Sequence, residues 1–288
     1  MNGKLIFVLL LCCIAAPASA FNFNLDLGKA LDTIKKAQQA TTEIDEPKEI
    51  ELGGGIASNL LGAAPLLQNP QVQKYVNNIG LWLALQTERP GLPWHFGVLD
   101  DNDVNAFAAP GGYVFVTKGL LAQMRSEAEL AGVLAHEIAH VLRKHHLQAI
   151  KQGARTGLLA DFAGHALQKK GADPALAKLV NAGTEVYARG LDKGDEFEAD
   201  RMGVVIAARA GYDPYGLPAV LQALQGMNAQ DSSLALLFKT HPALDERLNL
   251  LDRLMPGQFD NFEQQPGQEP RFMAVMGKTG ILVDPNRH

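Results

Sequence analysis

An HExxH motif constrains this chain more than any other feature of its sequence. It lies in a segment whose apolar residues recur at helical spacing, and Ser126 followed by Glu129 is typical of a helix start. Residues four apart on a helix differ by about 40° around its axis, so His136 and His140 share one face. Two imidazoles on one face can bind a zinc ion, and Glu137 beside it can take a proton from the zinc-bound water. The motif therefore predicts a helix that carries a zinc site.

The first candidate for a third zinc ligand is His146, which has the spacing of the third histidine in HExxHxxGxxH sites. Such sites need a glycine to turn the chain back toward the metal, and Arg143 occupies that position. An unbroken helix would point His146 away from His136. Residues 143–146 are therefore expected to form the exposed basic end of the helix.

The better candidate is Glu196, in the sequence Asp-Glu-Phe-Glu-Ala-Asp. A helix is expected from about Asp195 to Arg209, and it would place Glu196 and Asp200 on one face and Glu198 on the opposite side. One carboxylate can bind zinc while the other accepts the free ring N–H of a ligand histidine. The alternative is an acidic helix start that only complements the helix dipole.

Four blocks together resemble the CAAX-prenyl-protease or HtpX-type zinc metallopeptidases, a gluzincin family. In the family's order, between about residues 62 and 255, they are NAFAAPGG at 105–112, HExxH at 136–140, ExEAD at 196–200, and His241-Pro242 followed by Arg247. The chain looks like the soluble, exported, BepA-like or OMA-like branch, without tandem repeats. The resemblance implies one zinc ion per chain, and an α+β, mainly helical, gluzincin-like fold with a small sheet whose edge strand lines the cleft.

The resemblance also assigns roles to residues. It implies His136, His140 and Glu196 as the zinc ligands, Glu137 as the general base, and Asp200 as a carboxylate behind the ligands. Arg247 would orient nearby carboxylates. His241 would either plug the open coordination position or help to stabilise the oxyanion, and its alternative is a surface His-Pro that opens a helix.

Three short strands are expected, at 95–99, about 105–109 and 113–117. Either of the last two could pair with an extended peptide through backbone hydrogen bonds. The residues expected to bind substrate are Asn105, Ala106, Phe107 and Ala108. Further helices are expected from 69 to about 89, at 218–225 and at 242–254, with a short strand near Ile281.

The first twenty residues of the chain suggest export. Residues 1–20 are expected to be a cleaved signal peptide, with Lys4, an apolar run of about 12 residues and a small-x-small site at its end. An uncleaved anchor or a lipid-modified cysteine is the alternative. Residues 21–61, which include Gly53-Gly54-Gly55, are expected to form an arm or linker, 62–255 the metallopeptidase domain, and 256–288 a C-terminal tail.

The composition argues against two further classes of function, nucleic-acid binding and thiol chemistry. The 26 basic and 31 acidic residues give a net charge of −5 without long blocks of one sign, which argues against nucleic-acid binding. Both cysteines lie in the expected signal, so the mature chain would have no thiol chemistry.

The sequence thus predicts a zinc metalloendopeptidase of the periplasm, acting on unfolded or misassembled proteins in quality control. Secretion, or anchoring to the membrane by an uncleaved signal, is the alternative location. Peripheral association with a membrane is compatible with the sequence but not required by it. The sequence does not predict the oligomeric state. The alternative function is a chaperone-like or binding protein with a closed, mainly structural zinc site.

Overall fold

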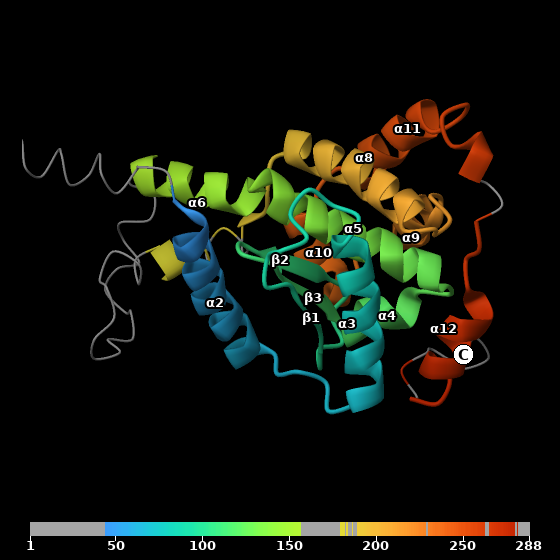
Figure 1. Ribbon diagram of the computed structural model, residues 1–288, viewed down its shortest axis with the longest axis horizontal. Helices are drawn as coiled ribbons and strands as arrows, with labels where there is room; N and C mark the ends of the chain where they lie inside the picture. The colour runs from blue at the N-terminus through green and yellow to red at the C-terminus, as the bar shows by residue number, and fades with distance from the viewer. Residues whose placement is uncertain are drawn as a thin grey trace, which may run out of the picture. The chain divides into compact units, whose positions relative to one another are not determined.

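The computed structural model of the protein describes residues 44–156, 179–181, 183, 186, 189–228, 230–262, 265–279 and 281. The expected signal peptide and the first part of the expected arm lie outside these ranges. In chain order, the elements are α2 Glu46–Ala63, α3 Pro70–Ala84, β1 His95–Leu99, β2 Ala106–Ala109, β3 Tyr113–Thr117, α4 Lys118–Gln123, α5 Glu127–Arg143, α6 His145–Thr156, α8 Lys193–Arg209, α9 Gly216–Gln225, the 3₁₀ turn Ser232–Leu234, α10 Ala235–Thr240, α11 Leu244–Leu254, the 3₁₀ turn Asp260–Phe262 and α12 Glu269–Met276. The fold is mainly helical with one small sheet, as the sequence predicted (Figure 1).

The sheet has the strand order β1-β3-β2. β1 runs parallel to β3, and β2 runs antiparallel to it, with Ala106 opposite Val116 and Ala109 opposite Tyr113. Gly111 and Gly112 make the turn between β2 and β3 with φ of 77° and 100°, a region that only glycine enters readily. Because β3 is the central strand, its backbone groups are already paired, and the expectation that it could pair with a peptide is wrong. β2 is an edge strand of this sheet.

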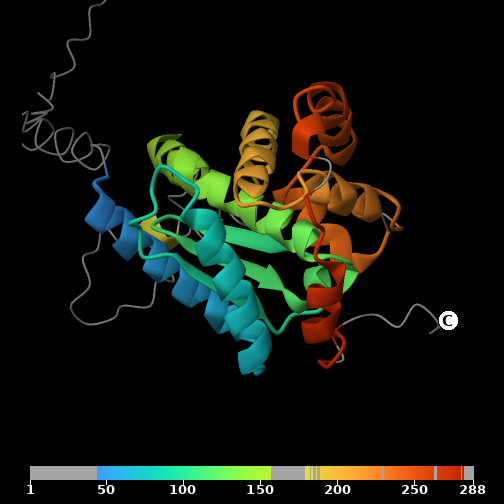
Figure 2. The ribbon, with the colours of Figure 1, turned by 45° about the vertical axis from the view of Figure 1, so that its right-hand side comes forward.

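Each strand divides its side chains between two hydrophobic clusters, as the pleat requires. Val114 and Val116 of β3 belong to the cluster that contains α3 and α5, whereas Phe115 faces the cluster that contains α2 and α6. Figure 2 shows α2 and α5 on either side of the strands. The sheet is therefore covered on both faces, and α5 lies against it on one of them.

Helix α2 occupies much of the segment that was expected to be a linker. Its three consecutive glycines do not break it, because it begins with the capping residue Asp45 and buries Leu52 and Ile56 completely. A Cβ at Gly53 would lie 1.7 Å from the carbonyl oxygen of Pro110. The glycine is needed for the close approach of α2 to the turn between β2 and β3, so this run belongs to a packed helix.

Glu49 of α2 anchors this helix to the rest of the fold. Its buried carboxylate accepts hydrogen bonds from Arg89 at 2.9 and 3.2 Å and from the backbone N–H of Gly111 at 3.3 Å. Lys144, at the C-terminus of α5, pairs with it at 3.0 Å. Burial raises the pKa of Glu49, but the hydrogen bonds and charges of Arg89 and Lys144 outweigh it and lower the pKa. One carboxylate thus joins α2, the turn after β2 and the end of α5.

We expect Glu49→Gln to lower the free energy of unfolding by about 2–3 kcal/mol at pH 7, because charge-assisted hydrogen bonds are lost in a buried place. The pKa of Glu49 is lower in the folded than in the unfolded protein, so this stabilisation is complete above about pH 5. It is lost as the pH falls through the folded-state pKa. Urea unfolding at pH 7 and at decreasing pH should therefore show the gap between wild type and variant shrinking. Glu51→Gln, at an exposed position of α2, is the control; an equal effect of both variants would contradict the prediction.

Helix α12, within the segment expected to be a C-terminal tail, contributes to the core. Phe272 and Met276 of α12 are completely buried in the main cluster. Arg271 of α12 pairs with the buried Glu127 in the first turn of α5, which also accepts hydrogen bonds from Tyr75 at 2.5 Å and Tyr212 at 2.8 Å. The short strand expected near Ile281 falls mostly outside the described residues, and Ile281 itself belongs to no strand. α12 therefore fixes the N-terminal end of the motif-bearing helix.

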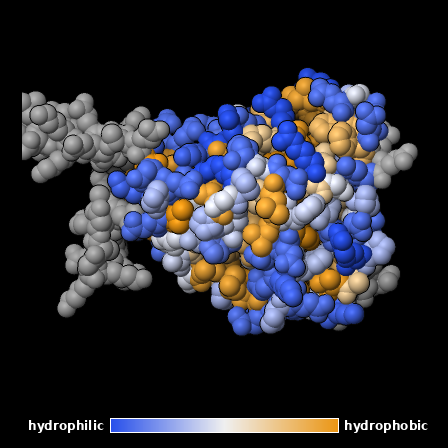
Figure 3. Space-filling view, viewed as in Figure 1, coloured by the Kyte–Doolittle hydropathy of each residue, from blue (hydrophilic) through white to orange (hydrophobic). Residues whose placement is uncertain are grey.

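The surface is mixed in polarity. Figure 3 shows apolar residues scattered among hydrophilic ones on one face. The large exposed apolar side chains among the described residues include Leu81 and Trp82 of α3 and Leu85 directly after it. No helix within the described ranges combines the length and the apolar character needed to cross a membrane.

Candidate metal centre

The HExxH residues lie in the middle of α5 and are buried. Ser126 caps this helix by accepting a hydrogen bond from the N–H of Glu129 at 3.1 Å, as expected. His136 and His140 project toward α8, and their Nε2 atoms are 3.0 Å apart. The approach of α8 depends on Gly203, because a Cβ there would lie 2.9 Å from the backbone nitrogen of His136. Close packing of two helices thus brings a second set of side chains to the imidazoles.

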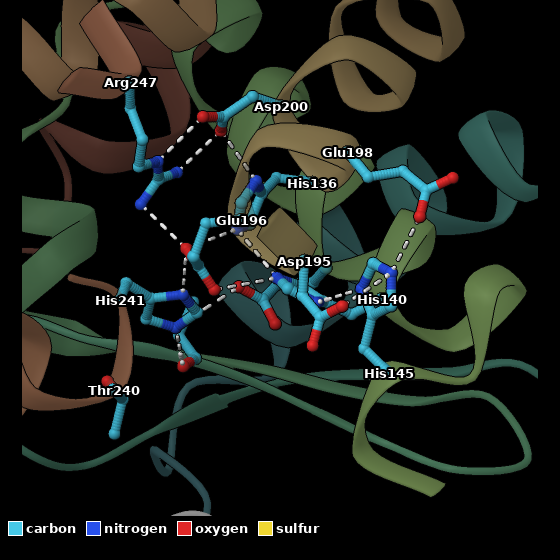
Figure 4. Close-up of polar contacts among 12 residues, drawn as sticks. His136, His140, His145, Asp195, Glu196, Glu198, Asp200, Thr240, His241 and Arg247 are labelled. Carbon is cyan, nitrogen blue, oxygen red and sulfur yellow. Dashed lines mark hydrogen bonds and ion pairs between the residues drawn. The ribbon is translucent and has the colours of Figure 1, made fainter. Parts of the chain in front are cut away.

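Glu196 in the first turn of α8 completes a group of three (Figure 4). Its Oε1 lies 3.4 Å from Nε2 of His140, and its Oε2 lies 3.6 Å from Nε2 of His136. Ligand atoms bound tetrahedrally at about 2.0–2.1 Å are about 3.3–3.4 Å apart, which is close to these separations. Oε1 of Glu196 has no hydrogen-bond partner among the described residues although it is buried. The donor set and its spacing fit zinc.

His241 is a fourth residue close to His136, His140 and Glu196. It follows α10, and its Nδ1 lies 3.1 Å from Oε2 of Glu196, while its Nε2 lies 3.4 Å from the carbonyl oxygen of Ala106 and 3.8 Å from Oε1 of Glu137. His136, His140, Glu196 and His241 can each offer one ligand atom such that all four atoms lie within 4.8 Å of one another. The surface alternative for His241 is wrong, because the residue is buried against the site.

Asp200 and Arg247 lie behind this group. Oδ1 of Asp200 is 3.0 Å from Nδ1 of His136. Arg247 of α11 donates to both oxygens of Asp200 at 2.7 and 2.6 Å, and its Nη1 is 2.9 Å from Oε2 of Glu196. The guanidinium thus holds two carboxylates, one on each side of His136, in fixed positions.

The electrostatics of the group follow from burial and from these contacts. Burial would raise the pKa of Glu196, but the charges of His241 and Arg247 hold it well below its usual value. Burial and the charge of His136 lower the pKa of His140. Burial alone would lower the pKa of His136, but hydrogen bonds to Asp200 and Glu196 raise it to about 9. The carboxylate is therefore ionised, as a metal ligand must be.

Glu137 has a different environment from the carboxylate of Glu196. Its pKa is raised, and burial is the largest cause. Its Oε2 has no hydrogen-bond partner among the described residues. A buried carboxylate whose pKa is raised accepts a proton more readily than an ordinary one, which suits a group that must both accept and release a proton.

The residues expected to bind substrate lie beside His241. Ala106, Phe107 and Ala108 belong to β2 and are buried, and Asn105 directly precedes the strand. The side chain of Asn105 accepts a hydrogen bond from the backbone N–H of Ala106 at 2.9 Å. Ala106, Phe107 and Ala108 line a small cavity together with Glu137 and His241.

Of residues 143–146, Arg143 ends the helix and is exposed as expected, but the structure corrects the expectation for His145 and His146. Helix α5 ends at Arg143, and Lys144 has φ of 58°, so the chain turns sharply before α6. His145 and His146 are consequently buried. The ring centroid of His146 lies 5.5 Å from that of His140, and burial and the charge of His241 lower the pKa of His146 to about 3. Absence of glycine had suggested an unbroken helix, but a lysine makes the turn.

Glu198 was expected to point away from the site, and its role was missed. Its Oε2 lies 3.2 Å from Nε2 of His145, and its Oε1 lies 2.7 Å from Arg143. The sequence contains the basic residues Arg143 and His145 and the acidic Glu198, on α5, α6 and α8, but their pairing could not be recognised before the turn at Lys144 was known.

Comparisons with known proteins agree with this geometry. The model of peptidase family M48 matches residues 70–255. The beta-barrel assembly-enhancing protease of Yersinia pestis is 31% identical over 225 residues, which are 76% of this chain and 46% of that protein. The corresponding protein of Escherichia coli K12 is 30% identical over 70% of this chain and 42% of its own length. The mitochondrial metalloendopeptidase OMA1 of Arabidopsis thaliana is 31% identical over 58% of this chain and 33% of its own.

The chain thus spans half the length, or less, of the beta-barrel assembly-enhancing proteases it matches. The matched region contains the three strands, α5, α8 and the loop of His241. On the extent of this match, and with the HExxH helix and its glutamate in place, the chain belongs to peptidase family M48.

Proposed function

We propose that this protein is a zinc-dependent metalloendopeptidase. The observation that carries the proposal is the buried group of His136, His140 and Glu196, with Glu137 on the same helix as the two histidines. The relatives are named as proteases or metalloendopeptidases. In this proposal the two histidines and Glu196 hold one zinc ion per chain.

Zinc bound by three protein ligands supplies a Lewis acid and lowers the pKa of a coordinated water toward about 7. Glu137 acts as the general base for the attacking water and passes the proton to the leaving amine. Its raised pKa suits this exchange, since the same carboxyl must both accept and donate. Asp200 holds His136 by its Nδ1, and Arg247 holds Asp200 and Glu196 in place.

The substrate in this proposal is an extended segment of an unfolded or misassembled protein. β2 is the edge strand next to the site, and an extended peptide placed along it would be recognised by its backbone more than by its side chains. His241 stands between β2 and Glu196, so it would have to move, or contribute to oxyanion stabilisation, when a substrate binds. We assign the activity to the cell envelope, in protein quality control, on the basis of the expected signal peptide and the names of the bacterial relatives.

Metal removal tests this proposal directly. We expect 1,10-phenanthroline to abolish the cleavage of unfolded casein, and zinc to restore it at about one ion per chain, because the three ligands form a single site. Cleavage is followed by gel electrophoresis, and bound zinc by elemental analysis. Full activity of a protein that elemental analysis shows to be free of metal would contradict it.

The position of His241 also favours a second candidate function. If its ring is a fourth ligand, the metal site is closed and mainly structural, and the protein acts by binding or as a chaperone. This candidate predicts one bound zinc but no cleavage of casein or of other unfolded proteins, together with suppression of their aggregation. If the protein instead hydrolyses amide bonds outside proteins, it should release product from a cell-wall or lipid amide and leave proteins uncleaved.

A further inference from the structure

His145 lies directly against the side of the His140 ring that faces away from Glu196 (Figure 4). The two Nδ1 atoms are 2.9 Å apart, while Nε2 of His140 faces Glu196. On its other side, Nε2 of His145 is 3.2 Å from Oε2 of Glu198. His145 is 2% exposed, whereas Glu198 reaches solvent. A chain of two hydrogen bonds therefore leads from the candidate metal ligand to a carboxylate at the surface.

These two hydrogen bonds define which ring nitrogens of His140 and His145 carry protons. A hydrogen bond between two imidazole nitrogens needs one N–H and one bare nitrogen. If His140 binds a metal through Nε2, that atom is bare and the proton of the neutral ring is on Nδ1. Nδ1 of His145 must then be the acceptor, so His145 carries its proton on Nε2 and donates it to Glu198. Each atom in the chain has a single role that is compatible with metal binding.

We propose that His145 is a positioning residue of the metal centre, which holds His140 in the tautomer and the orientation that bind zinc. This rests on the proposed function only in requiring a metal at the site. Behind His136, Oδ1 of Asp200 lies 3.0 Å from Nδ1 of the ring. Helix α8 thus supplies a carboxylate behind each ligand histidine, directly at Asp200 and through His145 at Glu198.

The backbone around Lys144 is what places His145 there. Five positions along an unbroken helix amount to about 500°, which would turn residue 145 about 140° away from residue 140. Lys144 instead has φ of 58°, which residues other than glycine adopt rarely, and its side chain pairs with Glu49 at 3.0 Å. Arg143 holds Glu198, the last residue of this series of hydrogen bonds, by pairing with it at 2.7 Å. The two residues that precede His145 therefore fix the turn and the carboxylate on which these hydrogen bonds depend.

The test compares two substitutions at this position in the full chain. His145→Leu fills a similar space without an acceptor, whereas the Oδ1 of His145→Asn can accept the proton of His140 near the original Nδ1. We expect the leucine variant to bind zinc about 10–100-fold more weakly than wild type, and the asparagine variant to recover most of that loss. Zinc affinity is measured by competition with a chromogenic chelator. His95→Leu, at an exposed histidine on β1, is the matched control and should leave the affinity unchanged.

Each outcome decides the proposal. Unchanged zinc affinity of His145→Leu would overturn it, and so would equal losses in the leucine and asparagine variants, since that would show a requirement for the ring and not for the acceptor. Thermal unfolding in excess chelator shows whether a variant folds without metal. Because the readout is zinc affinity, a wild-type protein that binds zinc and cleaves no peptide would refute the peptidase function while leaving this test intact.

A measurement on the wild type does not depend on any variant folding. In zinc-loaded protein labelled with ¹⁵N-histidine, long-range ¹H–¹⁵N spectra report the tautomer of each ring. We expect His145 to carry its proton on Nε2 and His140 to carry its proton on Nδ1. A His145 ring protonated at Nδ1 would overturn the proposal.

Discussion

Glu137→Gln is expected to reduce the cleavage of unfolded casein by at least about 10²–10⁴-fold while zinc stays bound. A glutamine cannot accept the proton of the attacking water, and general base catalysis contributes about this much to an enzymatic rate. Glu137 is not one of the four residues whose ligand atoms cluster, so its substitution leaves the zinc ligands in place. The measurement is kcat/KM for casein beside the zinc content of the same preparation.

Glu88→Gln, at an exposed glutamate, is the control for the loss of one negative charge and should cleave casein like wild type. Cleavage by Glu137→Gln at the rate of wild type would refute the assignment of the base. Loss of zinc from this variant would show that Glu137 holds the metal and is not only a base beside it.

Arg247→Met is expected to lower the free energy of unfolding by about 3–5 kcal/mol, measured by urea unfolding at pH 7 in excess chelator. Removing one partner of a buried ion pair leaves an uncompensated buried charge, and here two carboxylates lose their guanidinium. Arg247 is 2% exposed, and Glu196 and Asp200 are 0% and 1% exposed. The charges of His241 and Arg247 keep the pKa of Glu196 low despite burial, and the charge and hydrogen bonds of Arg247 do the same for Asp200.

Arg253→Met, at an exposed arginine of the same helix α11, is the matched control and should change stability by less than about 0.5 kcal/mol. The double variant Arg247→Met/Asp200→Asn should be less destabilised than the sum of its single variants, because the unpaired charge of Asp200 has been removed. Additive effects would contradict the role given to Arg247. The loss should also diminish at acid pH, because carboxyls whose folded pKa is lowered contribute stability that disappears as the pH falls through that pKa.

Local patterns predicted the individual elements well. The three strands lie at or within one residue of their expected positions, because β-branched and aromatic residues there alternate between two apolar faces. The helix from Ser126 follows from a cap and an apolar stripe, and α8 begins only two residues before its expected start. These signals act over a few residues, so the sequence contains them in full.

The errors arose where distant contacts decide the structure. Gly53-Gly54-Gly55 is a turn signal in isolation, yet it lies in α2 because the helix must approach Pro110 closely. The C-terminal segment has no strong pattern, yet Phe272 and Met276 bury completely against α3 and α5. In both cases burial against another element outweighs a local preference.

In the candidate site, too, some residues could be placed by local spacing and others only by tertiary packing. His136, Glu137 and His140 could be placed by spacing along one helix, and Glu196 with Asp200 by spacing along another, since helix geometry fixes which residues share a face. That α8 packs on α5 at Gly203, so that Glu196 reaches both imidazoles, depends on contacts between segments about 60 positions apart. The positions of His241 and Arg247 depend on the same packing.

By itself, the sequence determined the type of site, the helix that carries it and the chemistry open to it, because those follow from residue types at fixed helical spacing. Only the tertiary structure decided that His145 and Glu198 stand behind His140. A positive φ at Lys144, made tolerable by its contact with Glu49 on another helix, reverses the chain after α5, and no pattern within that helix encodes such a turn.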